Sequence, residues 1–357
     1  MAEDVVLRSE SPNGNAEAVV EDDGRAVYLY QYFPEGLGQE LRATWVRNRV
    51  AAPAEVVRAD MEQGLAPLMP ARFCAHPQGA PAVDPTRAKL VWLPDGNGVA
   101  LFEGPDVVAC TVPWHGRKDC PGYARDAVGQ APFAWRLEQA DEIAARFRAA
   151  QRYWDSWESR VTWEEKRRAV REALERSLGP QQSYREEAVA WPPLGLGVFQ
   201  SDRAVTVATV GMSQRPMPAV ELAHAEPRLW RRVELAVALP HGASELLRER
   251  VADLLTLASE LPWQRYTWLG HGHTVPADAF KGTPFTGVLV ASSAKFAGPV
   301  PLPEVDGDPV TLLWLVPVTA EELTKVRGGA ADGFLAGVQQ PRPFADTPSP
   351  PGERGNS

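Results

Sequence analysis

The stretch LPWQRYTWLGHGHT at residues 261–274, followed by FTGVLV at 285–290 and TLLWLVPVT at 311–319, decides the fold of this chain. The last two segments are apolar runs of strand length. The run at 310–318 is apolar on both alternating faces, which predicts a central strand covered on both sides. Thr319 and Glu322 form a capping box that starts a helix directly after it. We therefore predict strands and a capped helix around aromatic anchors, with no nucleophile–base pair.

The residues before this stretch extend the same pattern. Ser244 is placed to cap a helix over 245–260, in which apolar residues recur at helical spacing. Residues 229–239 alternate with a period of two, which predicts a strand. One face of that strand carries Leu229, Val233, Leu235, Val237 and Leu239, and the other carries Trp230, Arg232 and Glu234.

Residues 185–337 resemble the suppressor-of-fused (SUFU) domain. The motifs that carry the resemblance are Leu261-Pro262-Trp263, Gly270-His271, and the run Leu315-Val316-Pro317-Val318-Thr319-Ala320-Glu321-Glu322. The resemblance implies an α/β domain that binds proteins and has no established catalysis. Animal members clasp an extended peptide of a transcription factor as an added strand, and bacterial members are often proposed to be immunity proteins that neutralise a cognate toxin.

The whole chain is predicted to be an α/β (α+β) protein of two domains. The first is a mixed β-sheet with helices, and the second is the SUFU-like domain. Thr162 and Glu165 form a further capping box, which predicts that a helix restarts there. The predicted ranges are a disordered N-terminus at 1–25, a β-rich domain at 26–158, a connecting helix at 159–184, the SUFU-like domain at 185–337 and a disordered proline-rich tail at 338–357.

Composition and charge exclude several classes of function. The chain has 357 residues, 44% of them hydrophobic, and a net charge of −9. An acidic surface repels phosphate, so we expect no nucleic-acid partner and no anionic membrane surface as a partner. No apolar run approaches the roughly 20 residues that a membrane-spanning helix needs. Three cysteines and the absence of a signal pattern at the N-terminus predict a cytoplasmic protein.

The N-terminal half holds one candidate metal or nucleophile set. Its members are Cys74, His76, Cys110, His115 and Cys120. Zinc sites usually have paired ligands two to four residues apart, whereas only Cys74 and His76 lie close together here. Buried structural cysteines are common, so we expect no metal and no cofactor. A hydrolase that uses this set remains an alternative, because a thiolate beside a histidine is a nucleophile.

The second candidate set lies in the SUFU-like region. His271 and His273 have the spacing of two metal ligands, with Asp278 as the nearest third ligand in the sequence. The simpler interpretation is a glycine-flanked turn whose imidazoles cap backbone groups. Trp263 and Trp268, together with the two histidines, are candidate partner-binding residues, because tryptophan is enriched at binding hot spots.

We predict a non-enzymatic protein that acts by stoichiometric binding. The expected partner is a protein, and in a bacterium a toxin effector. A regulatory partner of a transcription factor and a hydrolase that uses the cysteine–histidine set are the two alternatives. The sequence leaves open which strand edge binds the partner, and it leaves the oligomeric state open.

Overall fold

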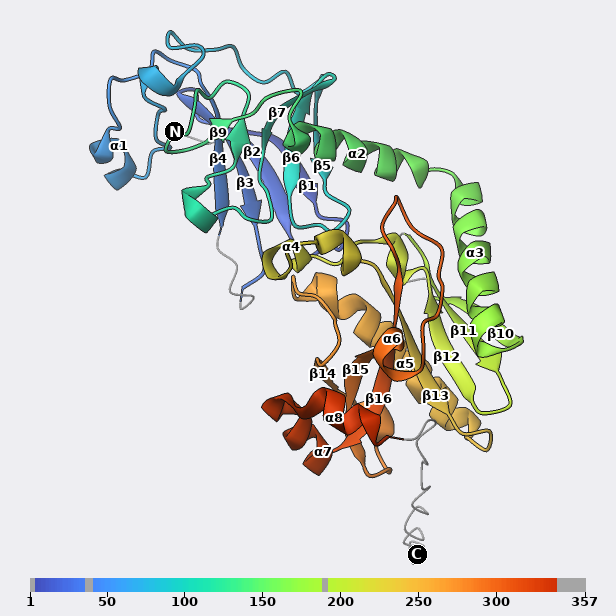
Figure 1. Cartoon of the computed structure of the whole chain (residues 1–357). Coiled ribbons are helices and arrows are strands. Elements are labelled where there is room, and N and C mark those ends of the chain that lie inside the picture. Colours follow the sequence, from blue (N-terminus) through green and yellow to red (C-terminus); the bar gives the residue numbers. More distant parts are fainter. Residues whose placement is uncertain (1–3, 36–40, 188–191, 339–357) are drawn as a thin grey trace, which may run out of the picture. The chain divides into compact units, whose positions relative to one another are not determined.

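Two units with separate cores make up the chain in this computed structural model, which describes residues 4–35, 41–187 and 192–338 (Figure 1). The first unit spans Met1–Glu158 and includes Trp263–Tyr266, and the second spans Ser159–Pro262 and Thr267–Ser357. Both units combine sheets with helices. The predicted α/β class with two domains is therefore confirmed.

The first unit is built on two sheets. One has four antiparallel strands in the order β1 (Asp4–Glu10), β2 (Glu17–Asp22), β3 (Ala26–Tyr32) and β4 (Arg42–Asn48). The other has the order β5 (Ala88–Trp92), β6 (Val99–Glu103), β7 (Asp106–Cys110), β8 (Tyr123–Ala124) and β9 (Trp135–Arg136). Short helical segments lie at α1 (Arg58–Glu62), η1 (Ala71–Phe73) and η2 (Arg117–Asp119).

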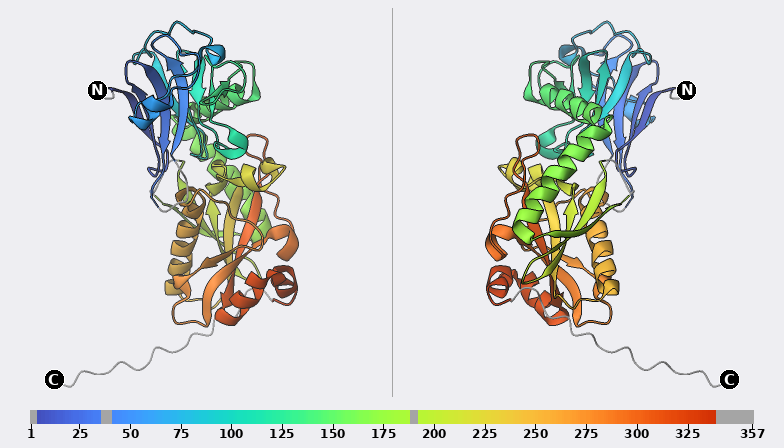
Figure 2. Two further views of the ribbon diagram at one scale, coloured as in Figure 1. Left: turned by 90° about the vertical axis from the view of Figure 1, so that its left-hand side faces the viewer. Right: turned by 90° about the vertical axis from the view of Figure 1, so that its right-hand side faces the viewer.

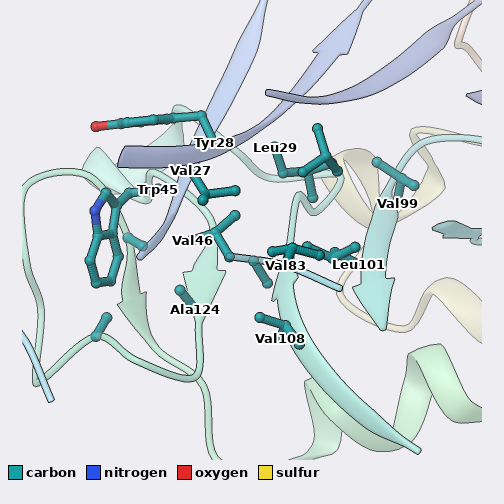
Figure 3. Close-up of a cluster of buried hydrophobic side chains, with 14 of the residues drawn as sticks. Val27, Tyr28, Leu29, Trp45, Val46, Val83, Val99, Leu101, Val108 and Ala124 are labelled. Atoms are coloured by element: carbon teal, nitrogen blue, oxygen red, sulfur yellow. The ribbon is translucent and has the colours of Figure 1, made fainter. Parts of the chain in front are cut away.

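Apolar side chains of the two sheets face each other and form the core of the first unit. Figure 3 shows Val27 and Leu29 of one sheet directed towards Val99 and Leu101 of the other. The opposite face of the five-stranded sheet is covered by α2 (Glu142–Ser156), whose Phe147 is buried there. The five-stranded sheet therefore separates two apolar clusters.

The predicted disorder of residues 1–25 is wrong for the residues that the structure describes. Strands β1 and β2 form an antiparallel hairpin, and β2 pairs in turn with β3. Ala16, Ala18 and Val20 alternate with polar residues, and their side chains are buried in the core between the sheets. The polar composition hides this period-two pattern, and pairing with neighbouring strands supplies the burial that the segment lacks alone.

The second unit is a seven-stranded mixed sheet with helices on both faces. Its strand order is β10 (Gln181–Glu187), β11 (Leu194–Gln200), β12 (Val205–Val210), β13 (Val233–Leu239), β16 (Thr311–Thr319), β15 (Phe285–Ser292) and β14 (Thr274–Pro276). Strand β16 runs parallel to β13 and antiparallel to β15. Its inner residues are all buried, which confirms the predicted central strand.

Helices α3 (Arg160–Leu178) and α5 (Glu245–Gln264) lie on opposite faces of this sheet (Figure 2). The predicted connecting helix at 159–184 thus differs from the structure, because α3 packs its Val170 and Leu174 on the sheet and residues 181–184 belong to β10. The remaining helices and turns are η3 (Met212–Gln214), α4 (Val220–Ala223), η4 (Pro227–Leu229), η5 (Asp278–Phe280), α6 (Ser293–Phe296), α7 (Ala320–Lys325), η6 (Val326–Ala330) and α8 (Ala331–Ala336).

Local capping signals had different outcomes. Thr319 and Glu322 form the predicted capping box at the start of α7, and Ser244 accepts a hydrogen bond from the backbone N–H of Leu247. The capping box predicted at Thr162 is absent, because α3 already begins at Arg160. The predicted proline-rich tail falls almost entirely on residues 339–357, outside the described residues.

Candidate functional site

The open edge of the seven-stranded sheet at β10 is the best candidate site for a protein partner. Among the described residues β10 pairs with β11 alone, and most of its side chains are exposed. The opposite edge, β14, has three residues and ends with Pro276, which has no N–H to donate. An added strand therefore finds a longer set of backbone partners at β10 than at β14.

Helix α3 fixes one face of β10. The indole N–H of Trp163 donates to Oε1 of Glu186 at 3.1 Å, and Arg167 pairs with the same carboxylate. The guanidinium of Arg171 lies 4.5 Å from the ring centroid of Tyr184. Hydrogen bonding to Arg167 and Trp163 keeps the pKa of Glu186 below its usual value, although burial opposes this. These contacts hold the edge strand in place before any partner binds.

The other face of β10 borders a groove of about 460 Å³. Apolar side chains of β11 and β12 form its floor, and polar or charged side chains of β10 and α5 form its rim. The floor residues are Leu196, Val198 and Val207, and the rim residues are Gln182, Ser183, Arg185, Glu245, Arg248 and Glu249. Tyr184 and Ala252 also line the groove. An apolar floor inside a polar rim is the usual anatomy of a protein-binding surface.

A buried polar network supports the loops at one end of this sheet. The carboxylate of Glu234 is fully buried in β13 and accepts four hydrogen bonds, from the hydroxyls of Thr209 and Ser213 and from the backbone N–H groups of Gly211 and Ser213. The donor–acceptor distances are 2.6 to 3.1 Å. Burial raises the pKa of the Glu234 carboxyl, although these hydrogen bonds oppose the effect.

Arg232 extends this network to a second loop. Its Nη1 donates to the carbonyl oxygens of Ser213 and Gln214, and its Nε donates to Asp308 Oδ2, each at 2.9 Å. The strand predicted over 229–239 differs from the structure, in which β13 begins only at Val233. Both faces of β13 are buried. The face that carries Arg232 and Glu234 is covered by loop residues, which satisfy both charges.

The N-terminal cysteines are divided between two cores. Cys74 lies between the two sheets, where its thiol donates to the Met69 carbonyl oxygen at 3.4 Å. Cys110 and Cys120 lie in the cluster on the opposite face of the five-stranded sheet. The structure therefore separates Cys74 from the other two thiols. Among the described residues no group of three or more histidine, cysteine or carboxylate side chains is arranged to hold a metal ion.

The electrostatics of these side chains do not favour a nucleophilic thiolate. Burial raises the pKa of Cys74 to about 11 and also raises the pKa of Cys110 and of Cys120. Burial, together with the nearby Arg42 guanidinium, lowers the pKa of His115 to about 4. The His76 side chain is mostly exposed, and its Nε2 lies 4.0 Å from Asp126 Oδ1. A reactive thiolate needs an accessible, polar setting, which these three thiols lack.

We expect all three thiols of the folded protein to react slowly with a chromogenic disulfide at mildly alkaline pH, because burial disfavours the thiolate. Denaturation should release three reactive thiols per chain. Absorbance of the released aromatic thiol measures the rate of reaction in the folded protein and in the denatured protein. Fast reaction of one thiol in the folded protein, or stoichiometric zinc found by elemental analysis, would contradict this and favour the hydrolase alternative.

The second predicted set does not converge on one point. Nε2 of His271 lies 2.7 Å from Asp332 Oδ1, and its Nδ1 accepts the Ser292 backbone N–H at 3.2 Å. His273 instead packs against Trp268, with ring centroids 4.4 Å apart. Asp278 belongs to η5. The two imidazoles therefore make separate structural contacts.

The two candidate tryptophans also differ in exposure. Trp263 is buried, and its carbonyl oxygen accepts a hydrogen bond from Asn15 Nδ2 at 2.7 Å. Trp268 is half-buried and contacts the ring of His224, which stacks on the exposed Trp230. Sequence reasoning missed the β10 groove, because its rim combines β10 with α5, whose lining residues lie about 60 residues apart in the sequence.

Comparison with models of protein families finds a match, and it lies in the second unit. Residues 191–345 match the model of the Suppressor of fused protein (SUFU) family. These residues form a SUFU domain within the chain. No curated protein matches the chain significantly. The matched range begins just after β10, so the candidate edge lies at the boundary of the SUFU domain.

The SUFU domain identifies a protein-binding module. The family consists of non-enzymatic regulatory proteins that bind other proteins. In the described part of the chain, no helix has the length and apolar character needed to cross a bilayer.

Proposed function

We propose that this chain binds a protein partner stoichiometrically and that an extended segment of the partner adds to the sheet at β10. The observation that carries the proposal is the open edge of β10 beside the groove under α5. Backbone N–H and C=O groups of the edge supply affinity, and alternate side chains of the added strand enter the groove and supply specificity.

The charge of the groove rim fits a partner segment of mixed polarity. Glu245 and Glu249 of α5 present carboxylates, while Arg185 and Arg248 present guanidinium groups. Apolar residues at alternate positions of the segment would cover the half-buried Val198 on the floor, since Leu196 and Val207 are already buried within the unit. Burial of the partner's apolar side chains would stabilise the complex by about 25 cal/mol for each Å² of apolar surface.

We further propose that the partner is a toxin effector and that binding neutralises it, as expected of a bacterial immunity protein. The net charge of −9 supports a basic partner, because opposite potentials accelerate encounter. Affinity capture from the organism of origin, with mass spectrometry, identifies the partner class. A captured DNA-binding regulator would instead favour the transcription-factor alternative.

Glu249→Trp tests the location of the site once the partner is purified. The indole fills the groove, so we expect the dissociation constant to rise by at least about tenfold, or 1.4 kcal/mol. Glu172→Trp is the matched control, because Glu172 is an exposed glutamate on α3 outside the groove. Isothermal titration calorimetry of both variants gives the affinity and the stoichiometry. Equal affinity of Glu249→Trp and the unmodified protein would rule out this groove.

A further inference from the structure

The outward face of α5 carries four residues in a self-complementary order: Leu246, Arg250, Asp253 and Leu257. At 3.6 residues per turn they lie within about 60° of one another around the helix. We call them the α5 stripe. Leu246 is 57% exposed and Leu257 is 66% exposed. Figure 2 shows α5 on one face of the seven-stranded sheet, opposite α3.

Single exposed leucines are common and carry no argument by themselves. The order of the four residues along the helix, however, is informative. The midpoint of the stripe lies between Val251 and Ala252, and the members are placed symmetrically about it. If a second α5 runs antiparallel across this midpoint, each Leu246 lies opposite a Leu257 and each Arg250 lies opposite an Asp253.

We infer that the α5 stripe binds a second copy of this chain through a two-fold axis that passes near Val251 and Ala252. In such an interface the same surface serves both copies, so every contact occurs twice. The rise of about 1.5 Å per residue places the two ion pairs near the axis and the two leucine pairs about 8 Å from it. Leucine burial stabilises the pair, and the charges set its register and antiparallel direction.

The charge pattern favours this occupant over an unrelated partner. Arg250 and Asp253 are three residues apart, so the stripe presents both signs and complements its own reversed copy. Nη1 of Arg250 donates to the Lys281 carbonyl oxygen at 2.9 Å, which anchors the guanidinium and uses only one of its five N–H donors. Asp253 is exposed beside it.

The α5 stripe is separate from the groove at β10. The groove is bordered by Glu245, Arg248, Glu249 and Ala252, which lie about 70° to 170° around the helix axis from the centre of the stripe. Association of two copies and binding of a protein partner therefore use different residues of α5. A stripe on one helix is smaller than the roughly 800 Å² per partner of a standard interface, so the dimer is weak and depends on concentration.

Sedimentation velocity over a wide concentration range tests the inference on the full chain. The unmodified protein is expected to move from monomer to dimer as its concentration rises. Leu257→Glu places a charged side chain opposite Leu246 in each apolar contact and should leave a monomer at concentrations where the unmodified protein is dimeric. Val161→Glu is the matched control, because Val161 is 59% exposed on α3 outside the stripe, and it should dimerise normally.

Charge exchange tests the register itself. Arg250→Asp gives a copy with two acids in the stripe, and Asp253→Arg gives a copy with two bases. Each variant alone should raise the dimer dissociation constant by at least about tenfold. An equimolar mixture should form a heterodimer, because every acid then faces a base, and the double variant should recover the homodimer.

Circular dichroism confirms that each variant is folded. The inference is overturned if the unmodified protein stays monomeric at every concentration, if Leu257→Glu leaves the dimer intact, or if mixing the two charge variants forms no heterodimer. The partner-binding variant Glu249→Trp is scored by calorimetry alone, so the failure of one proposal leaves the other open to its own test.

Discussion

Glu234→Ala is expected to lower the free energy of unfolding of the second unit by about 4 kcal/mol. The change leaves the hydroxyl of Thr209, the N–H of Gly211 and both donors of Ser213 buried without their acceptor. Each buried donor without a partner costs on the order of 1 to 3 kcal/mol, and some of that cost is recovered when water enters the cavity. Chemical denaturation followed by tryptophan fluorescence measures the loss.

Glu234→Gln is the matched control. A glutamine of the same shape keeps Oε1, which accepts three of the four hydrogen bonds, and exchanges only the oxygen that faces Thr209. We expect a loss of about 1 to 2 kcal/mol. If alanine costs no more than glutamine, the network does not hold the turn at η3.

Gly179→Ala is expected to destabilise the second unit by about 3 kcal/mol and to displace β10. Gly179 follows α3 with φ 96° and ψ 176°, a conformation that only glycine adopts readily. A Cβ placed there would lie 2.2 Å from the carbonyl oxygen of Gln200. The chain must shift where it enters the edge strand.

Gly242→Ala is the control for this change. Gly242 has no left-handed φ, and nothing lies within 4 Å of a Cβ built on it, so alanine should be nearly neutral. Denaturation gives the stability of both variants, and hydrogen exchange reports on β10. Unchanged stability and exchange in Gly179→Ala would show that β10 does not depend on this turn.

The capping boxes show how far local sequence signals reach. At Thr319 the chain leaves a strand, the amide of Glu322 is free to bond the threonine hydroxyl, and the motif forms. At Thr162 the amide already donates to the carbonyl oxygen of Ser159, because the chain turns sooner after α2. The motif was the same, and the preceding turn decided its outcome.

The candidate site was harder to predict from the sequence than the fold was. Charged residues among apolar neighbours, such as Arg232 and Glu234, were a usable signal of a buried network, but alternation alone shows only that they share one face of the strand. The five cysteine and histidine candidates share one unit, and yet Cys74 lies between the two sheets, Cys110 and Cys120 lie on the opposite face of the five-stranded sheet, and His76 is mostly exposed. Spacing in sequence does not determine which face a distant strand presents.

The sequence by itself determined the elements whose signals lie within a few residues: the doubly buried strand β16, the start of α7, the cap of α5 at Ser244 and the motifs of the SUFU domain. Only the tertiary structure decided that β10 is an edge, that residues 4–22 pair as strands and that Glu234 is satisfied inside the sheet. The physical reason is the separation in sequence over which the deciding interactions act. Periodicity and capping depend on neighbours within a turn or a strand, whereas edges and buried charges depend on partners far away in the chain.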